Sequence, residues 1–357
     1  MLEEKEFELP GLEADGGFVN TLVRYKPKAA TVKAATTPFE RPRVHLSLVL
    51  LHAIASHKES WLPTVEHLFE LQETIPTNAF TIVEAWSMDK PNHGHAAVAN
   101  QHRLIEDPRV ISGRQVGRAV QAFLKSGLIA AGSTVVAIGH SAGACIMVQA
   151  TDDCAVTELP FSSLIMVDPP MMTPEILQKA LAEGWPLLRA MEIAKNRKDV
   201  WPSRSAAKEW FAKRFPWRRW DPRVLDLYVE HALCDLPTAS YPDLKEGVTL
   251  SISRAQEING YSGHADAHAA LERLKVLCPT IPVHCIFGGQ VDMVPLESQA
   301  AIVDEDAGRR MRSIVRIARS GHLLVQEAPR DLALAIWSIL HEDYARPTAP
   351  TSTTARL

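Results

Sequence analysis

The sequence predicts an α/β fold, with a mostly parallel central sheet flanked by helices and one mainly helical insertion. Two observations predict this class. Short, almost wholly apolar segments alternate with longer segments of helical periodicity, as expected for parallel strands that are buried on both faces and joined by helices. After residues 168–170 this alternation stops, and residues 171–245 carry helical patterns rich in Trp, Arg and Lys.

The predicted strands are apolar runs, and the predicted helices carry apolar residues at helical spacing. Strands are expected at residues 18–25, 44–51, 80–86, 133–138, 161–167, 281–287 and 311–317, with a further candidate at 248–252. Helices are expected at residues 57–72, 110–128, 144–150 and 323–340. Because strands alternate with helices, successive strands should run parallel and helices should cover both faces of the sheet.

These patterns divide the 357 residues into four parts. We expect the first part of the core over residues 1–168, a mainly helical cap over 169–275 and the second part of the core over 276–343. Residues 344–357 are rich in Pro, Thr and Ser and are predicted to be a flexible tail. Five of the eight tryptophans fall in the cap, where most should be core residues and one or two should line the substrate site.

The composition excludes several classes of function. A net charge of −4 predicts no attraction to nucleic acid or to an anionic membrane surface. No apolar run approaches the ~20 residues that a membrane-spanning helix needs. The N-terminal residues are acidic, so no secretory signal is expected. The five cysteines form no C-x-x-C pair, which predicts reduced thiols.

One stretch predicts the chemistry. Residues Gly139-His140-Ser141-Ala142-Gly143 fit the pattern G-x-S-x-G and stand between the strand at 133–138 and the helix at 144–150. In this context the pattern is a nucleophile elbow, in which a sharp turn strains the serine backbone and exposes its hydroxyl. Ser141 is therefore the predicted nucleophile. The alternative is an ordinary glycine-rich turn with an inert serine.

A serine nucleophile needs a base within hydrogen-bond reach and a group that orients this base. His322 follows the last predicted strand and is the predicted general base. Two carboxylates are candidates for the orienting acid: Asp292 follows the strand at 281–287, and Asp168 ends the strand at 161–167. Each also has a structural interpretation as a turn or loop cap, and the pattern alone leaves both open.

The oxyanion formed during acyl transfer should be bound by two backbone N–H groups. One is expected from Ala142, directly after the nucleophile. The other should come from the loop that follows the strand at 44–51, with Ile54 favoured over Ala53.

Two histidine-rich segments are candidate metal sites. His264 and His268 have the i, i+4 spacing of two ligands on one helical face, but no third ligand stands nearby at a usual spacing. Residues 92–95, Asn-His-Gly-His, follow Asp89 in a predicted loop and are expected to form a structural turn near the rim of the site. We therefore predict no metal and no cofactor.

With these residues in place, the sequence resembles α/β-hydrolases of fungal type that are associated with peroxisomes and with toxin or other secondary-metabolite pathways. That group includes a yeast peroxisomal lipase-like enzyme and peroxisomal acyl-CoA hydrolases. Beside the elbow, the matching stretches between about residues 44 and 342 are His52-Ala53 with His57–Trp61, Asp89 with Asn92–Gly94, and Trp201–Arg204 with Trp220–Val229.

The resemblance implies an α/β-hydrolase fold with a helical cap after the sixth strand. It also implies a serine hydrolase that cleaves an ester or thioester, such as an acyl-CoA or another acyl intermediate of secondary metabolism. In acyl-CoA hydrolases of this kind the acid follows the strand before the cap, which brings Asp168 level with Asp292 or slightly ahead. An acyltransferase with the same residues is the alternative function, and a non-catalytic binding protein is a third that an intact serine and histidine argue against.

The last three residues, Ala355-Arg356-Leu357, match the small–basic–Leu form of the S-K-L peroxisomal signal. At the end of a flexible tail this signal would bind the peroxisomal import receptor. We therefore expect the peroxisomal matrix, with the cytoplasm as the alternative if the match is fortuitous. A homodimer is compatible with these patterns.

Overall fold

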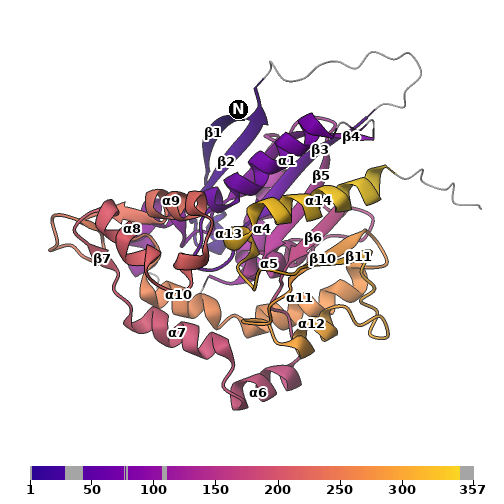
Figure 1. Cartoon of the computed structure of the whole chain (residues 1–357). Helices are drawn as coiled ribbons and strands as arrows, with labels where there is room; N and C mark the ends of the chain where they lie inside the picture. Colours follow the sequence, from indigo (N-terminus) through magenta and orange to yellow (C-terminus); the bar gives the residue numbers. More distant parts are fainter. Residues whose placement is uncertain (1, 29–42, 76, 78, 107–110, 346–357) are drawn as a thin grey trace, which may run out of the picture.

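The centre of the computed structural model is an eight-stranded sheet with the order β1-β2-β4-β3-β5-β6-β10-β11 (Figure 1). Its strands are β1 (Leu2–Leu9), β2 (Asn20–Pro27), β3 (Val44–Leu51), β4 (Phe80–Met88), β5 (Thr134–His140), β6 (Ser163–Val167), β10 (Val283–Gly288) and β11 (Ser313–Ile317). β1, β2 and β4 pair antiparallel, and all pairs from β4 to β11 are parallel. The predicted α/β class with a mostly parallel sheet is therefore confirmed.

The structure describes most of the chain, namely residues 2–28, 43–75, 77, 79–106 and 111–345. The predicted C-terminal signal, Ala355-Arg356-Leu357, and most of the predicted tail lie outside these residues. Within them, no helix is both long enough and apolar enough to cross a membrane.

Helices cover both faces of the sheet (Figure 1). One face carries α1 (Leu62–Thr74) and α14 (Pro329–Tyr344), and the other carries α4 (Gly113–Leu124), α5 (Ala142–Gln149) and α11 (His264–Leu277). Strand β3 shows how the sequence achieves this, because successive side chains of a strand point to opposite faces. Leu48 and Leu50 join the core under α1 and α14, whereas Val49 and Leu51 join the core under α4 and α5.

The insertion follows β6, the sixth strand, and lies at the lower left of Figure 1. Its elements are α6 (Pro174–Ala182), α7 (Pro186–Asn196), β7 (Val200–Trp201), α8 (Arg204–Ala212), η3 (Trp217–Arg219), α9 (Pro222–His231), β8 (Leu233–Asp235), β9 (Val248–Leu250) and α10 (Arg254–Tyr261). Trp201 and Trp217 are buried in a separate hydrophobic core with Phe211, in line with the expectation that most cap tryptophans are structural.

Two details of the insertion differ from the prediction. The candidate strand at 248–252 is present as β9, but it pairs with β7 and β8 in a small antiparallel sheet and does not extend the central one. The predicted boundary at residue 275 lies inside α11, and this helix packs against α5 as part of the main core. The geometry therefore favours an insertion that ends before His264.

The remaining elements are short. They are η1 (Glu13–Asp15), η2 (Lys58–Trp61), α2 (Gly94–Ala99), α3 (Gln101–Glu106), α12 (Leu296–Ile302) and α13 (Leu324–Glu327). The helix predicted at 323–340 is divided into α13 and α14, because Pro329 lacks the N–H that a continuous helix would use and instead occupies the first turn of α14.

Candidate active site

Ser141 lies at the sharp turn between β5 and α5, the strand–turn–helix context that the sequence predicts. Its backbone has φ 54° and ψ −124°, a conformation that a residue with a side chain rarely adopts. Its N–H donates to the carbonyl of Val167, 2.9 Å away. A Cβ atom on Gly139 would lie 2.5 Å from the Ala144 Cα, and one on Gly143 would lie 2.3 Å from the Leu51 carbonyl oxygen. The two glycines are thus required where helix and strands make close contact.

The structure brings Ser141, His322 and Asp168 into one buried row. The Oγ of Ser141 lies 2.9 Å from Nε2 of His322, and the Nδ1 of His322 lies 2.7 Å from Oδ2 of Asp168. The carboxylate must accept from Nδ1–H, which leaves Nε2 as the acceptor for the serine hydroxyl. The second oxygen of Asp168 accepts from the N–H of Gly288 at 3.1 Å. This geometry is the one that a serine nucleophile, a general base and an orienting acid require.

Asp292, the other candidate acid, lies against the backbone of His322 rather than against its ring. Its Oδ1 accepts from the His322 N–H at 2.8 Å. The approach is so close that a Cβ atom on Gly321 would meet Oδ2 of Asp292 at 1.9 Å. Both predicted carboxylates therefore hold the same histidine, one through the ring and the other through the main chain.

His140 is a site residue for which the sequence analysis predicted no role. It directly precedes Ser141, and its Nε2–H donates to the carbonyl of His322 at 2.8 Å. Burial lowers the pKa of His140 to about 3, so the ring is neutral and carries its proton on Nε2. Its place inside the elbow was the available signal, but only the fold shows that this position faces the loop of His322.

The three predicted oxyanion residues all line the cavity beside Ser141. Ala142 opens α5, and Ala53 and Ile54 belong to the loop after β3. The insertion packs against this loop, because a Cβ atom on Gly260 of α10 would lie 3.3 Å from the Ile54 side chain. The loop therefore lies between the core and the insertion.

Two neutral histidines hold this loop in place. His52 donates from Nδ1 to the Ala53 carbonyl at 2.6 Å and accepts the Lys90 N–H on Nε2 at 3.2 Å. His93 accepts the Ala55 N–H on Nε2 at 3.1 Å and binds Asn92 Oδ1 through Nδ1 at 2.6 Å. Burial lowers the pKa of His52 and of His93 well below the usual value, which keeps each ring able to accept on Nε2.

The cavity has a volume of about 160 Å³ and a mainly apolar lining with a few polar groups. The insertion contributes Trp185, so at least one of its tryptophans lines the site. Of the two histidines with metal-ligand spacing, His264 lines the cavity, whereas His268 is not among the lining residues. Lys90 also lines the cavity and is only 4 % exposed.

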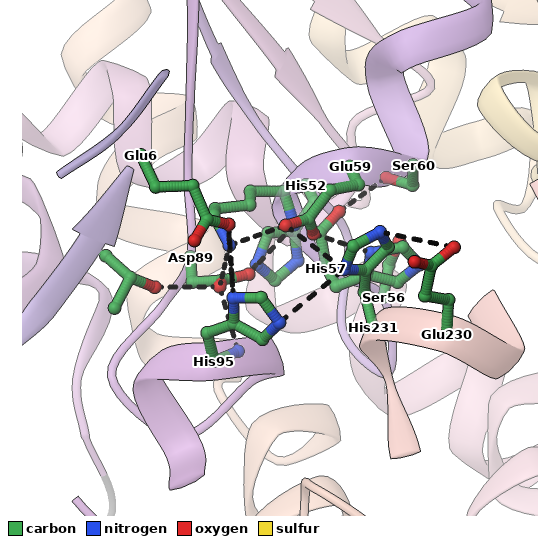
Figure 2. A network of polar contacts seen from close by, with 12 residues as sticks. Glu6, His52, Ser56, His57, Glu59, Ser60, Asp89, His95, Glu230 and His231 are labelled. Atoms are coloured by element: carbon green, nitrogen blue, oxygen red, sulfur yellow. Dashed lines mark hydrogen bonds and ion pairs between the residues drawn. The ribbon is translucent and has the colours of Figure 1, made fainter. Parts of the chain in front are cut away.

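A second polar cluster lies beside the loop after β3 (Figure 2). Its centre is the carboxylate of Asp89, which is fully buried. One oxygen accepts from the Lys58 N–H at 2.8 Å, and the other accepts from the Thr21 hydroxyl at 2.8 Å and the His95 N–H at 3.1 Å. A Cβ atom on Gly94, which has φ +52°, would lie 2.5 Å from this carboxylate. Residues 92–95 thus form a tight turn around Asp89.

This cluster contains the one group of three metal-binding side chains found among the described residues. Ligand atoms of Glu59, His95 and His231 lie within 4.8 Å of one another, and Figure 2 shows them pointing together. The Lys58 ammonium, however, already lies 2.6 Å from Glu59 Oε1 and 3.0 Å from His95 Nδ1. A metal ion bound there would face this cation at close range. The charges favour a structural role for the cluster.

The fold and this site define a hydrolase. A profile of the alpha/beta hydrolase family matches residues 48–335, and the chain belongs to that family.

The curated relatives are fungal. The type I acyl-CoA thioesterase mpaH of Penicillium roqueforti is 26 % identical over 205 residues, which are 57 % of this chain and 43 % of that protein. The chain therefore matches less than half the length of this relative. The Abhydrolase domain-containing protein ACTT2-1 of Alternaria alternata is 26 % identical over 232 residues, 57 % of this chain and 82 % of that protein.

Solved structures share the fold at low sequence identity. The peroxisomal alpha-beta-hydrolase Lpx1 of Saccharomyces cerevisiae has a TM-score of 0.68 at 16 % identity, and the match covers 100 % of this chain and 93 % of that one. A thioesterase domain from the curacin biosynthetic pathway has a TM-score of 0.60 at 16 % identity, covering 95 % and 99 %.

Proposed function

We propose that this protein is a serine hydrolase that cleaves an ester or thioester through an acyl-Ser141 intermediate. The observation that carries the proposal is the continuous row from the Ser141 hydroxyl through the His322 ring to the Asp168 carboxylate. A serine in this position has a base for its proton, and the base has an ionised partner that orients it.

In the first half of the reaction, the Ser141 oxygen attacks the substrate carbonyl while His322 Nε2 takes the serine proton. The resulting oxyanion is bound by the N–H groups of Ala142 and of Ile54 or Ala53. The tetrahedral intermediate then collapses, and the leaving thiol or alcohol takes the proton from His322. In the second half, His322 removes a proton from water, the resulting hydroxide attacks the acyl-serine, and Ser141 recovers its proton as the acid leaves. Asp168 remains ionised throughout.

The nature of the substrate is proposed from the relatives. Thioesterases occur among both the curated proteins and the solved structures that this chain resembles, so an acyl-CoA or related thioester is the first substrate class to test. The insertion, which lies over the cavity through Trp185 and Gly260, would act as a cap over the acyl group. The peroxisomal neighbour and the C-terminal Ala355-Arg356-Leu357 support a peroxisomal location.

A fluorophosphonate probe tests the mechanism directly, because it reacts only with an activated serine. We expect stoichiometric labelling of the wild-type protein at Ser141, identified by mass spectrometry of the labelled peptide. Ser141→Ala should remain unlabelled, and His322→Ala should label far more slowly. If Ser141 stays unlabelled in protein whose circular dichroism shows it to be folded, nucleophilic serine catalysis is wrong.

A further inference from the structure

One charged side chain in the cavity is not used by this mechanism. Lys90 follows β4 and Asp89 and lines the same cavity as Ser141, yet the residue is only 4 % exposed. Within the described part of the chain, its ammonium has neither a hydrogen bond to an oxygen nor an ion pair with a carboxylate. Burying an ammonium without such a partner is unfavourable. A position of this kind calls for a partner that the protein itself does not provide.

The groups around Lys90 do not neutralise it. The neighbouring Asp89 carboxylate is directed at the Lys58 and His95 N–H groups and the Thr21 hydroxyl. Cys145, on the cavity side, is a neutral thiol because burial raises its pKa to about 12.

The other titratable groups that interact with Lys90 are histidines. His52, His93 and His140 are all buried, and burial lowers the pKa of each, so all three are uncharged. Burial also lowers the pKa of Lys90 to about 7, although the negative charge of Asp89 opposes this effect. An anion bound beside Lys90 would raise this pKa again and remove the penalty.

The position of Lys90 indicates which part of the substrate it meets. The strand order β4-β3-β5-β6-β10-β11 places Lys90 on one side of Ser141 and His322 on the other. β4 is two strands from β5, which is ~10 Å at the usual strand spacing. A lysine side chain covers much of this distance, so a group bound to it would lie a few bonds from the carbonyl held at Ser141.

The small size of the cavity argues against the nucleotide phosphates of coenzyme A as that group. Sites that enclose ligands of drug size have volumes of ~300–1,000 Å³, whereas this cavity has about 160 Å³. A bulky leaving group must extend outside it. The group that reaches Lys90 therefore belongs to the acyl part of the substrate.

We propose that Lys90 binds a carboxylate carried by the acyl chain, so that the preferred substrates are half-esters or half-thioesters of dicarboxylic acids. This inference rests on the proposed function and adds the class of acyl group to it. The free carboxylate pairs with the Lys90 ammonium while the other carboxyl carbon is attacked by Ser141. The apolar part of the same cavity lining, which includes Ile111, Val116 and Ile146, suits the methylene groups between them.

The test compares aryl half-esters of dicarboxylic acids, from succinate to suberate, with neutral aryl esters of the same carbon number. We expect the wild-type enzyme to favour the half-ester at the best chain length. In Lys90→Met, which keeps the shape and removes the charge, the ratio of kcat/KM for half-ester to neutral ester should fall about 10- to 100-fold. Lys125→Met, at an exposed lysine, should leave the ratio unchanged. A wild-type ratio without preference, or an unchanged ratio in Lys90→Met, overturns the proposal.

A binding measurement separates this proposal from the proposed function. Calorimetry of the best dicarboxylate with Ser141→Ala and with Ser141→Ala/Lys90→Met requires no turnover. Binding that disappears with the lysine supports the carboxylate site, and binding that is absent or equal in both variants overturns it. Hydrolysis of the neutral esters and labelling of Ser141 test serine catalysis independently, so either proposal can fail while the other stands.

Discussion

Two of the buried histidine–carboxylate pairs in the described part of the protein differ in what the histidine meets on its far side. His322 Nδ1 lies 2.7 Å from Asp168, and His57 Nδ1 lies 3.0 Å from Glu59. The Nε2 of His322 contacts the Ser141 hydroxyl, whereas the Nε2 of His57 has no hydrogen-bond partner among the described residues. A histidine–carboxylate pair therefore contacts a serine hydroxyl in one region and only supports the local structure in the other, and this third group makes the difference.

The two pairs also differ in how their charge is neutralised. Glu59 bonds to the Lys58 ammonium at 2.6 Å, and its contacts with His57 and Lys58 hold the pKa of this carboxyl well below its usual range despite its burial. Asp168 instead accepts from an uncharged N–H group, that of Gly288, and from His322. In the proposed mechanism, the charge of Asp168 is thus left to stabilise the imidazolium that forms on His322. Changes in the His57–Glu59 pair should affect the fold, and changes in the His322–Asp168 pair should affect the reaction.

The largest expected effect is on the catalytic pair. Asp168→Asn should lower kcat/KM for an activated ester about 10⁴-fold, equivalent to ~5 kcal/mol of transition-state stabilisation, because an amide no longer holds the ring in the required tautomer. The melting temperature should change little. The matched variant is Glu59→Gln in the other pair, for which we expect lower stability with near-normal turnover per folded molecule. Similar activity losses in the two variants would show that the pairs are not functionally different.

The second-largest effect is expected on the stability of the polar cluster in Figure 2. Lys58→Met should lower the free energy of unfolding by about 3–5 kcal/mol, because it removes the cation that separates Glu59, Asp89 and Glu6. Urea denaturation measures this loss, with Lys125→Met as the control at an exposed lysine. A loss below about 1 kcal/mol would mean that the Lys58 charge does not hold the cluster together.

The inner parallel strands β3, β5, β6 and β10 could be predicted because each is a largely apolar run that is buried on both faces. β1 could not, since it is an edge strand whose charged and largely exposed residues give no apolar alternation. The short strands β7 and β8 depend on pairing within the insertion, and no local pattern marks them; β9 was the candidate strand at 248–252, but its pairing with β7 and β8 could not be predicted.

The candidate site also contains some residues that could be predicted from the sequence and others that could not. Ser141 and His322 could be placed because a motif and a position after the last strand mark them. Asp168 and Asp292 could not be distinguished, because both follow parallel strands at the same edge of the sheet, and a loop geometry decides which one reaches the ring. The burial of Lys90 could not be read from its neighbours in sequence, because it results from the packing of α5 and the loops around the cavity.

The smallest effect is expected at Asp292. The difference between its alanine and asparagine variants should distinguish it from Asp168. Asp292→Ala leaves the His322 N–H without its acceptor, which should cost about 1–3 kcal/mol of stability and, through a less fixed His322, about tenfold in kcat/KM. Asp292→Asn keeps a carbonyl oxygen that can accept from this N–H, so it should recover most of the loss. At Asp168 the asparagine variant should recover little over alanine, because the ring N–H needs an ionised partner. The measurements are steady-state kinetics and thermal unfolding of the alanine and asparagine variants at both positions. If asparagine restores activity at position 168 and not at position 292, Asp292 and not Asp168 is the orienting acid.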